Sequence, residues 1–186
     1  MELGACTLAE AITPGVGIAD TLMRHKLYTQ LALAIRDLHA GQLIHLDIKP
    51  QNILLTESGD VRLADLGLAT VFDATGSLRR THAGGTLMYT APEVRTGTYS
   101  AKADIYSLSL VFFEMAVGSL PDLDATDPLA PLRGGNPATF QIIDAMFHLR
   151  SADRPTADEL VALVGGAAAT SPPPSPVRHA SPKRRF

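Results

Sequence analysis

Apolar residues recur along the chain at spacings that predict helices and mark out its centre. Leu27, Leu31, Ile35 and Leu38 lie three or four positions apart, which is the spacing of one face of a helix. Farther along, residues 103–117 are almost wholly apolar. A helix that is apolar on all sides is expected at the centre of a domain, so this segment is the predicted core helix.

Two short apolar runs, Ile53–Leu55 and Val61–Leu63, flank a turn-like polar stretch and predict a small β-hairpin. Two further helices are predicted at residues 139–149 and 156–164. Thr156 can cap the second of them, because Glu159 stands three residues later and completes a capping box. The pattern therefore predicts a mainly α fold with a small hairpin on one side.

The composition changes once, near Gly165. Residues 165–186 are rich in alanine, proline and serine and end in a basic run, residues 183–185. Such a segment buries too little apolar surface to offset the entropy lost on ordering, so it is predicted to be disordered. The predicted division is a domain over residues 1–164 and a tail over residues 165–186. The basic run is interpreted as a solvated charged end, with a nuclear-import signal as the alternative.

Charge and cysteine content narrow the function classes. The net charge of −3 lacks the strongly basic character of a general nucleic-acid binder. Cys6 is the single cysteine, so no internal disulfide forms, and a reducing compartment is the simpler interpretation. We find neither a signal peptide nor an apolar run long enough to span a membrane. A cytoplasmic protein without nucleic-acid or membrane partners is expected, with the nucleus as the alternative location.

The segment His45-Leu46-Asp47-Ile48-Lys49-Pro50-Gln51-Asn52 carries most of the chemical signal. It lies between a predicted helix and a predicted strand, where an irregular loop can aim several polar side chains at one point. The segment resembles the catalytic loop of eukaryotic-type serine/threonine protein kinases. The resemblance implies that Asp47 accepts or orients the substrate hydroxyl proton, that Lys49 faces the transferring phosphate, and that Asn52 binds magnesium.

Two further motifs strengthen the resemblance. Asp65-Leu66-Gly67 resembles the family's Asp-Phe-Gly motif, which implies that Asp65 binds magnesium and that Leu66 packs inward as the phenylalanine does. Residues 85–93 resemble the end of the activation segment. There the resemblance implies that Thr86 bonds the catalytic loop.

The resemblance also predicts contacts between distant segments and the kind of ligand. Glu93 is expected to pair with Arg154, and Asp104 to bond the backbone of the catalytic loop. ATP and Mg²⁺ are the implied cofactors, and a protein is the implied substrate. Leu3, in a hinge-like stretch, and Leu54, beneath the adenine ring, are the implied nucleotide contacts.

The chain also departs from the family. No glycine-rich phosphate loop or strand lysine precedes Leu3, so the sequence predicts a kinase C-terminal lobe without its N-terminal lobe. Two interpretations follow: an apparently truncated serine/threonine kinase, or a catalytically inactive kinase-like binding module. Leu46 replaces the usual arginine, which argues against activation by a phosphate held at that position.

Placement within the family is less specific. The segments around Tyr99, Lys102 and residues 107–115 resemble the kinases of the translation initiation factor 2 alpha subunit, which is the favoured interpretation. The His-Leu-Asp sequence at residues 45–47 is instead similar to the Wee family of cell-cycle kinases.

Overall fold

The computed structural model describes residues 6–71, 77–79 and 87–170, and helices dominate them. The helices are α1 (Leu8–Ala11), α2 (Thr21–Ala40), α3 (Pro92–Arg95), α4 (Ala101–Val117), α5 (Pro137–Met146) and α6 (Ala157–Thr170). The strands are β1 (Cys6–Thr7), β2 (Leu43–Ile44), β3 (Ile53–Leu55), β4 (Val61–Leu63), β5 (Thr70–Val71), β6 (Ser77–Arg79) and β7 (Thr98–Ser100). The predicted mainly α fold with a small hairpin is confirmed.

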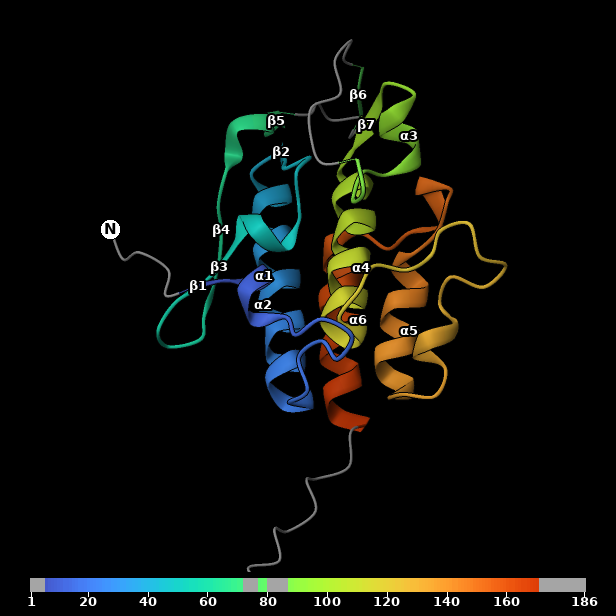
Figure 1. Cartoon of the computed structure of the whole chain (residues 1–186). Coiled ribbons are helices and arrows are strands. Elements are labelled where there is room, and N and C mark those ends of the chain that lie inside the picture. Colours follow the sequence, from blue (N-terminus) through green and yellow to red (C-terminus); the bar gives the residue numbers. More distant parts are fainter. Residues whose placement is uncertain (1–5, 72–76, 80–86, 171–186) are drawn as a thin grey trace, which may run out of the picture.

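The long helices form the body of the molecule. Figure 1 shows α2, α6, α4 and α5 side by side with roughly aligned axes, and β3 and β4 along the outer side of α2. The catalytic-loop segment follows α2 and β2 and leads into β3. The loop therefore lies between the helical body and the hairpin, and it can contact both.

Helix α4 lies at the centre, as its apolar sequence predicts. Residues 103–113 and Met115 of the helix are buried, and Phe112 is fully enclosed. Its ring stacks on Tyr28 of α2 with the centroids 4.1 Å apart, and the Tyr28 hydroxyl donates to the Phe112 carbonyl at 2.9 Å. The helix ends at Gly118, whose left-handed φ of 83° stops it.

The hairpin is confirmed and is larger than predicted. Ile53 pairs with Leu63 and Leu55 with Val61, in the antiparallel register that the two apolar runs allow. A third strand, β1, adds to its edge through the pairing of Cys6 with Leu55. Two residues give too short a pattern for a strand to be predicted.

The two C-terminal helices are confirmed with different bounds. Helix α5 begins earlier than predicted, because Asn136 accepts from the backbone N–H groups of Ala138 and Thr139 and thereby caps it. In α6 the expected capping box forms, since Thr156 and Glu159 bond each other's backbone N–H groups. Helix α6 then continues to Thr170, so residues 165–170 are helical where a disordered tail was predicted.

This difference in α6 has a physical cause. Extending an existing helix costs far less than starting one, and the alanines after the glycine pair are strong helix formers. The rest of the predicted tail, residues 171–186, lies outside the described residues. No helix in the described part of the chain combines the length and apolarity that crossing a membrane requires.

Candidate active site

A buried carboxylate at the start of α4 fixes the loop that contains Asp47. Asp104 is fully buried and accepts hydrogen bonds from the backbone N–H groups of His45 and Leu46, each at 2.9 Å. Its Oδ2 also lies 2.9 Å from Nε2 of His39. Leu46 has a left-handed φ of 65°, which costs a non-glycine residue about 1–2 kcal/mol. The two bonds to Asp104 hold this backbone in place, as predicted.

His45 supports the same loop from inside. Its side chain is fully buried, its Nε2 donates to the carbonyl of Ala64 at 3.2 Å, and its Nδ1 accepts from the N–H of Asp47 at 3.4 Å. Both ring nitrogens are thus engaged with backbone groups. The histidine acts as a structural support rather than a proton carrier.

The three catalytic-loop side chains singled out from the sequence meet at one carboxylate. Asp47 is 8% exposed, and its Oδ2 accepts from Nζ of Lys49 at 2.7 Å and from Nδ2 of Asn52 at 2.8 Å. Asn52 Nδ2 also donates to the Asp47 carbonyl at 2.9 Å. The carboxylate is therefore held in one orientation beside a positive charge, in a partly desolvated position where electrostatic forces are strong.

Asp65 comes close to Asn52 through backbone pairing. The N–H of Ala64, the residue before Asp65, donates to the carbonyl of Asn52 at 2.9 Å, just beyond the hairpin ladder. Asp65 has a left-handed φ of 59° and an exposed side chain, and its Oδ1 accepts from the Gly67 N–H at 3.3 Å. Asn52 precedes β3 and Asp65 follows β4, so both residues lie at the open end of the hairpin, and their role in binding magnesium stays a prediction.

The side-chain oxygens of Asn52 and Asp65 are suitable ligands for Mg²⁺. Because Asn52 uses its Nδ2 as a donor to Asp47, its amide oxygen is left as an acceptor, and Asp65 adds carboxylate oxygens. Magnesium prefers oxygen ligands and needs few from the protein when a nucleotide phosphate supplies others. Within the described ranges no cluster of three or more His, Cys, Asp or Glu side chains could hold a metal, so a fully protein-made metal site is not found there.

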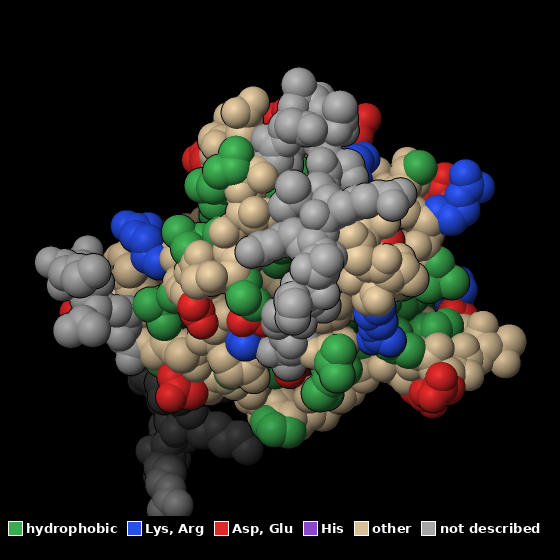
Figure 2. All heavy atoms as spheres, turned by 90° about the horizontal axis from the view of Figure 1, so that it is seen from above, with side chains coloured by type: hydrophobic (Ala, Val, Ile, Leu, Met, Phe, Trp, Pro, Cys, Tyr) green, Lys and Arg blue, Asp and Glu red, His purple; other side chains and the backbone are tan. Residues whose placement is uncertain are grey.

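Leu66 does not pack inward as expected. Its side chain is 51% exposed, and Val71, farther along the same segment, is 64% exposed. Within the described residues the body of the domain encloses neither side chain. Figure 2, a view of the molecule from above, shows hydrophobic side chains in small groups among acidic and basic ones.

The other predicted contacts vary in outcome. Leu54 is half-buried on β3, between Thr7 of β1 and Arg62 of β4. Leu3 and Thr86 lie outside the described residues. The roles predicted for these three residues stay predictions.

The expected Glu93–Arg154 pair is present and bidentate. Arg154 Nη1 and Nη2 donate to the two carboxylate oxygens of Glu93 at 2.6 and 2.9 Å. The Arg154 side chain is fully buried, and its guanidinium lies 4.9 Å from the ring centroid of Tyr106. The pair ties α3, which follows the activation-segment region, to the turn before α6.

A groove beside the catalytic loop was missed by sequence reasoning. It has a volume of about 650 Å³, and the Glu114 carboxylate from α4 lines it together with Tyr89. The Tyr89 hydroxyl donates to Glu114 Oε2 at 2.6 Å, and burial, followed by this bond, raises the pKa of Tyr89. Glu114 is a charged residue within an apolar run, and this was the sequence signal that could have pointed to the groove. The remaining lining residues are Lys49, Gln51, Asn52, Met88 and Leu120.

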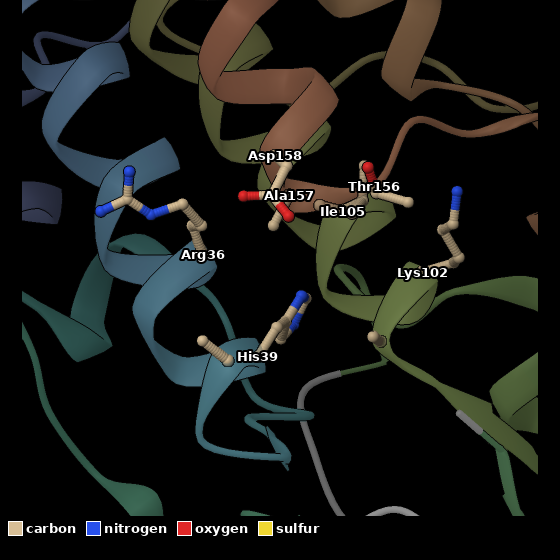
Figure 3. A pocket seen from close by; sticks show the side chains of 9 residues that line it. Arg36, His39, Lys102, Ile105, Thr156, Ala157 and Asp158 are labelled. Carbon is tan, nitrogen blue, oxygen red and sulfur yellow. The ribbon is translucent and has the colours of Figure 1, made fainter. Parts of the chain in front are cut away.

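A second cavity lies where the end of α2 meets the starts of α4 and α6 (Figure 3). It has a volume of about 510 Å³, and its polar lining includes Arg36, His39, Lys102 and Asp158. Burial lowers the pKa of Lys102, whose ammonium donates to the Arg154 carbonyl. The cavity shares no lining residue with the groove beside Asn52, and His39 connects it to Asp104.

Comparisons with known proteins agree with this geometry. The chain is 43% identical over 111 residues to CBL-interacting protein kinase 29 of Oryza sativa subsp. japonica, a match that covers 59% of the chain and 24% of that protein. It is 37% identical over 123 residues to a probable serine/threonine-protein kinase CHK1 homolog of Encephalitozoon cuniculi. This match covers 65% of the chain and 30% of that protein. It is 38% identical over 93 residues to serine/threonine-protein kinase PrkC of Bacillus subtilis. This match covers 50% of the chain and 14% of that protein.

The matched region thus spans less than a third of the length of each of these relatives. The family model of the protein kinase domain matches residues 1–163, which include the catalytic loop, the Asp65 motif and the Glu93–Arg154 pair. The chain therefore belongs to the protein kinase domain family.

Proposed function

We propose that this chain forms the catalytic-loop part of a serine/threonine protein kinase, which transfers the γ-phosphoryl group of ATP to hydroxyl groups of a protein substrate. The observation that carries the proposal is the arrangement around Asp47, whose Oδ2 accepts from both Lys49 and Asn52. Phosphoryl transfer depends on positioned opposite charges more than on covalent chemistry, and this loop supplies them.

Each side chain has a distinct part in that chemistry. The Asp47 carboxylate orients the substrate hydroxyl and accepts its proton, while Lys49 places a positive charge beside the transferring phosphoryl group. Asn52 and Asp65 would hold Mg²⁺, which neutralises charge on the nucleotide phosphates when bound. Asp104 acts through the backbone of the loop and keeps Asp47 aimed toward the substrate.

The finer assignments are also proposals. The nucleotide would lie against Leu54, and Thr86 would bond the catalytic loop. A place among the kinases of the translation initiation factor 2 alpha subunit rests on sequence resemblance around Tyr99 and Lys102 alone, and the relatives described above have other names. An intracellular location accords with ATP as the phosphoryl donor and with the single cysteine.

A kinase-like binding module without catalysis is the second candidate. It is favoured by the exposure of apolar side chains beside the site, above all Leu66 at 51%. Contiguous exposed apolar surface is typical of a face that a partner covers, and Leu66 would contribute to such a face in this candidate. The same loop would then serve to shape a docking surface.

The test is transfer of radiolabelled γ-phosphate from ATP to a generic serine/threonine substrate, by the chain and by any longer protein that contains it. Asp47→Asn and Asp65→Asn are each expected to lower transfer by at least about 100-fold. Asp144→Asn, an exposed aspartate on α5, is the matched control and should leave transfer unchanged. Transfer that survives Asp47→Asn would contradict the proposal. Absence of transfer in every form, with the fold intact by circular dichroism, would favour the binding module.

A further inference from the structure

The charges of this chain are strongly divided along its length. Residues 171–186 contain Arg178, Lys183, Arg184 and Arg185 and no acidic residue. Because the net charge of the whole chain is −3, residues 1–170 carry a net charge of −7. A chain with this distribution attracts its own C-terminal segment to acidic surfaces of its folded part.

The groove beside the catalytic loop offers such a surface. Among the residues that line it, Glu114 supplies the carboxylate that is not balanced by a cation. The Tyr89 hydroxyl occupies its Oε2 and fixes the side chain, and no described residue donates to its Oε1. Lys49, the cation in the same lining, is bonded to Asp47 at 2.7 Å. One carboxylate oxygen is thus held in a partly buried position and is available to a cationic side chain.

The segment that follows the groove in sequence carries further negative charge. The chain that continues from Leu120, a lining residue, carries Asp122 and Asp124 with exposed side chains. Gln51, which lines the groove from the catalytic loop, is neutral. The groove therefore suits a peptide with several positive charges, one of which reaches Glu114.

We propose that the groove around Glu114 binds the basic C-terminal segment of this chain, residues 171–186, with an arginine or lysine side chain on Glu114 Oε1. The inference rests on the proposed function, because it takes this groove as the place where a protein substrate lies. A fully extended segment of this length spans about 50 Å from Thr170, so it reaches the groove of its own chain or of a second copy. The segment includes Ser175 and Ser181, so it also brings hydroxyl groups toward Asp47.

The experiment measures binding rather than catalysis. A fluorescein-labelled peptide with the sequence of residues 171–186 is titrated with the full chain and followed by fluorescence anisotropy. Glu114→Gln, whose amide oxygen still accepts from Tyr89, is expected to weaken binding about fivefold, the size of a partly exposed ion pair. Glu57→Gln makes the same charge change at an exposed site on the hairpin turn and should leave the affinity unchanged. A peptide with glutamine at its four basic positions should bind weakly and equally to all three proteins.

A second variant identifies the occupant. Replacing the four basic residues of residues 171–186 by glutamine in the full chain removes the competing segment, so this variant should bind the labelled peptide more tightly than the parent. If binding within one chain dominates, the difference is independent of protein concentration, whereas exchange between copies makes it grow with concentration.

Three results would overturn the proposal. They are equal peptide affinity of the parent and Glu114→Gln, equal weakening by Glu57→Gln, and no gain on neutralising the chain's own segment. Failure of the proposed function has a different signature, namely Glu114-dependent peptide binding without any phosphoryl transfer. The two ideas are therefore tested separately.

Discussion

Replacing Arg154 by alanine is expected to destabilise the fold by about 3–5 kcal/mol, because a mostly buried carboxylate and several carbonyls lose their hydrogen-bond donor. The guanidinium donates to the two oxygens of Glu93 at 2.6 and 2.9 Å. It also donates to the carbonyls of His148, Lys102 and Leu149 at 2.8, 2.9 and 3.2 Å. The Arg154 side chain is 0% exposed and that of Glu93 is 15% exposed, so water replaces little of what is lost.

The size of the effect makes it measurable by urea denaturation followed by far-UV circular dichroism. A domain of ordinary stability unfolds at about 5–15 kcal/mol, so a loss of about 4 kcal/mol removes a large share of it. With a denaturant slope of about 2 kcal/mol/M, the midpoint moves down by about 2 M. Arg154→Lys keeps the charge but loses the bidentate geometry, so it should fall between alanine and the parent.

Two comparisons isolate the cause. Arg150→Ala removes an arginine that is 81% exposed and lies 3.5 Å from Asp153, so it should change stability by less than about 0.5 kcal/mol. Replacing Arg154 by methionine and Glu93 by leucine together removes the stranded charge, so the pair should cost less than Arg154→Ala alone. A midpoint for Arg154→Ala equal to that of the parent would refute the reasoning.

Three further predictions concern local features. Thr156→Ala removes the α6 cap and should lower the free energy of unfolding by about 1 kcal/mol in urea melts. Thr98→Ala, at an exposed site, should lower it little. Equal midpoints for the two variants would contradict the capping role. Gly118→Ala should destabilise by at least about 2 kcal/mol, because φ is 83° and a Cβ would lie 2.4 Å from the Thr13 carbonyl oxygen. Gly15→Ala, with φ of 71° and open space around it, should show only the backbone cost of about 1 kcal/mol. Burial raises the pKa of Tyr28, so stability is fully present below about pH 10 and is lost as the unfolded chain ionises above it. Tyr28→Phe should flatten that alkaline decline in stability, and an unchanged slope would argue against it.

Much of the fold could be predicted because its pattern is local. The continuous apolar run after Asp104 predicted the buried helix α4, and the two short runs around residues 57–60 predicted the hairpin. The capping box at Thr156 and Glu159 is also a signal within four residues. The α6 boundary was misplaced because a glycine pair weakens a helix without necessarily ending it.

What the sequence missed depends on contacts between distant segments. The bond between Tyr89 and Glu114 joins residues 25 positions apart, and no periodicity reports it. Leu66 was expected to pack inward because it is apolar, but no described part of the chain encloses it. The polarity of a side chain determines whether its burial is favourable, whereas the packing of the surrounding elements determines whether it is buried.

The sequence by itself determined the membership of a family and the types of residue at the site, because Asp47, Lys49, Asn52 and Asp65 stand in one ordered set of motifs. Only the tertiary structure decided how they act together. Asp104 from α4 fixes the backbone of the loop, and the pairing beyond the hairpin brings Asp65 beside Asn52. The tertiary structure also places Glu114 in the lining of a groove that Lys49 and Asn52 share. The physical reason is that identity and order are local properties of a chain, whereas distance, burial and the partner of a charge arise only when segments far apart pack together.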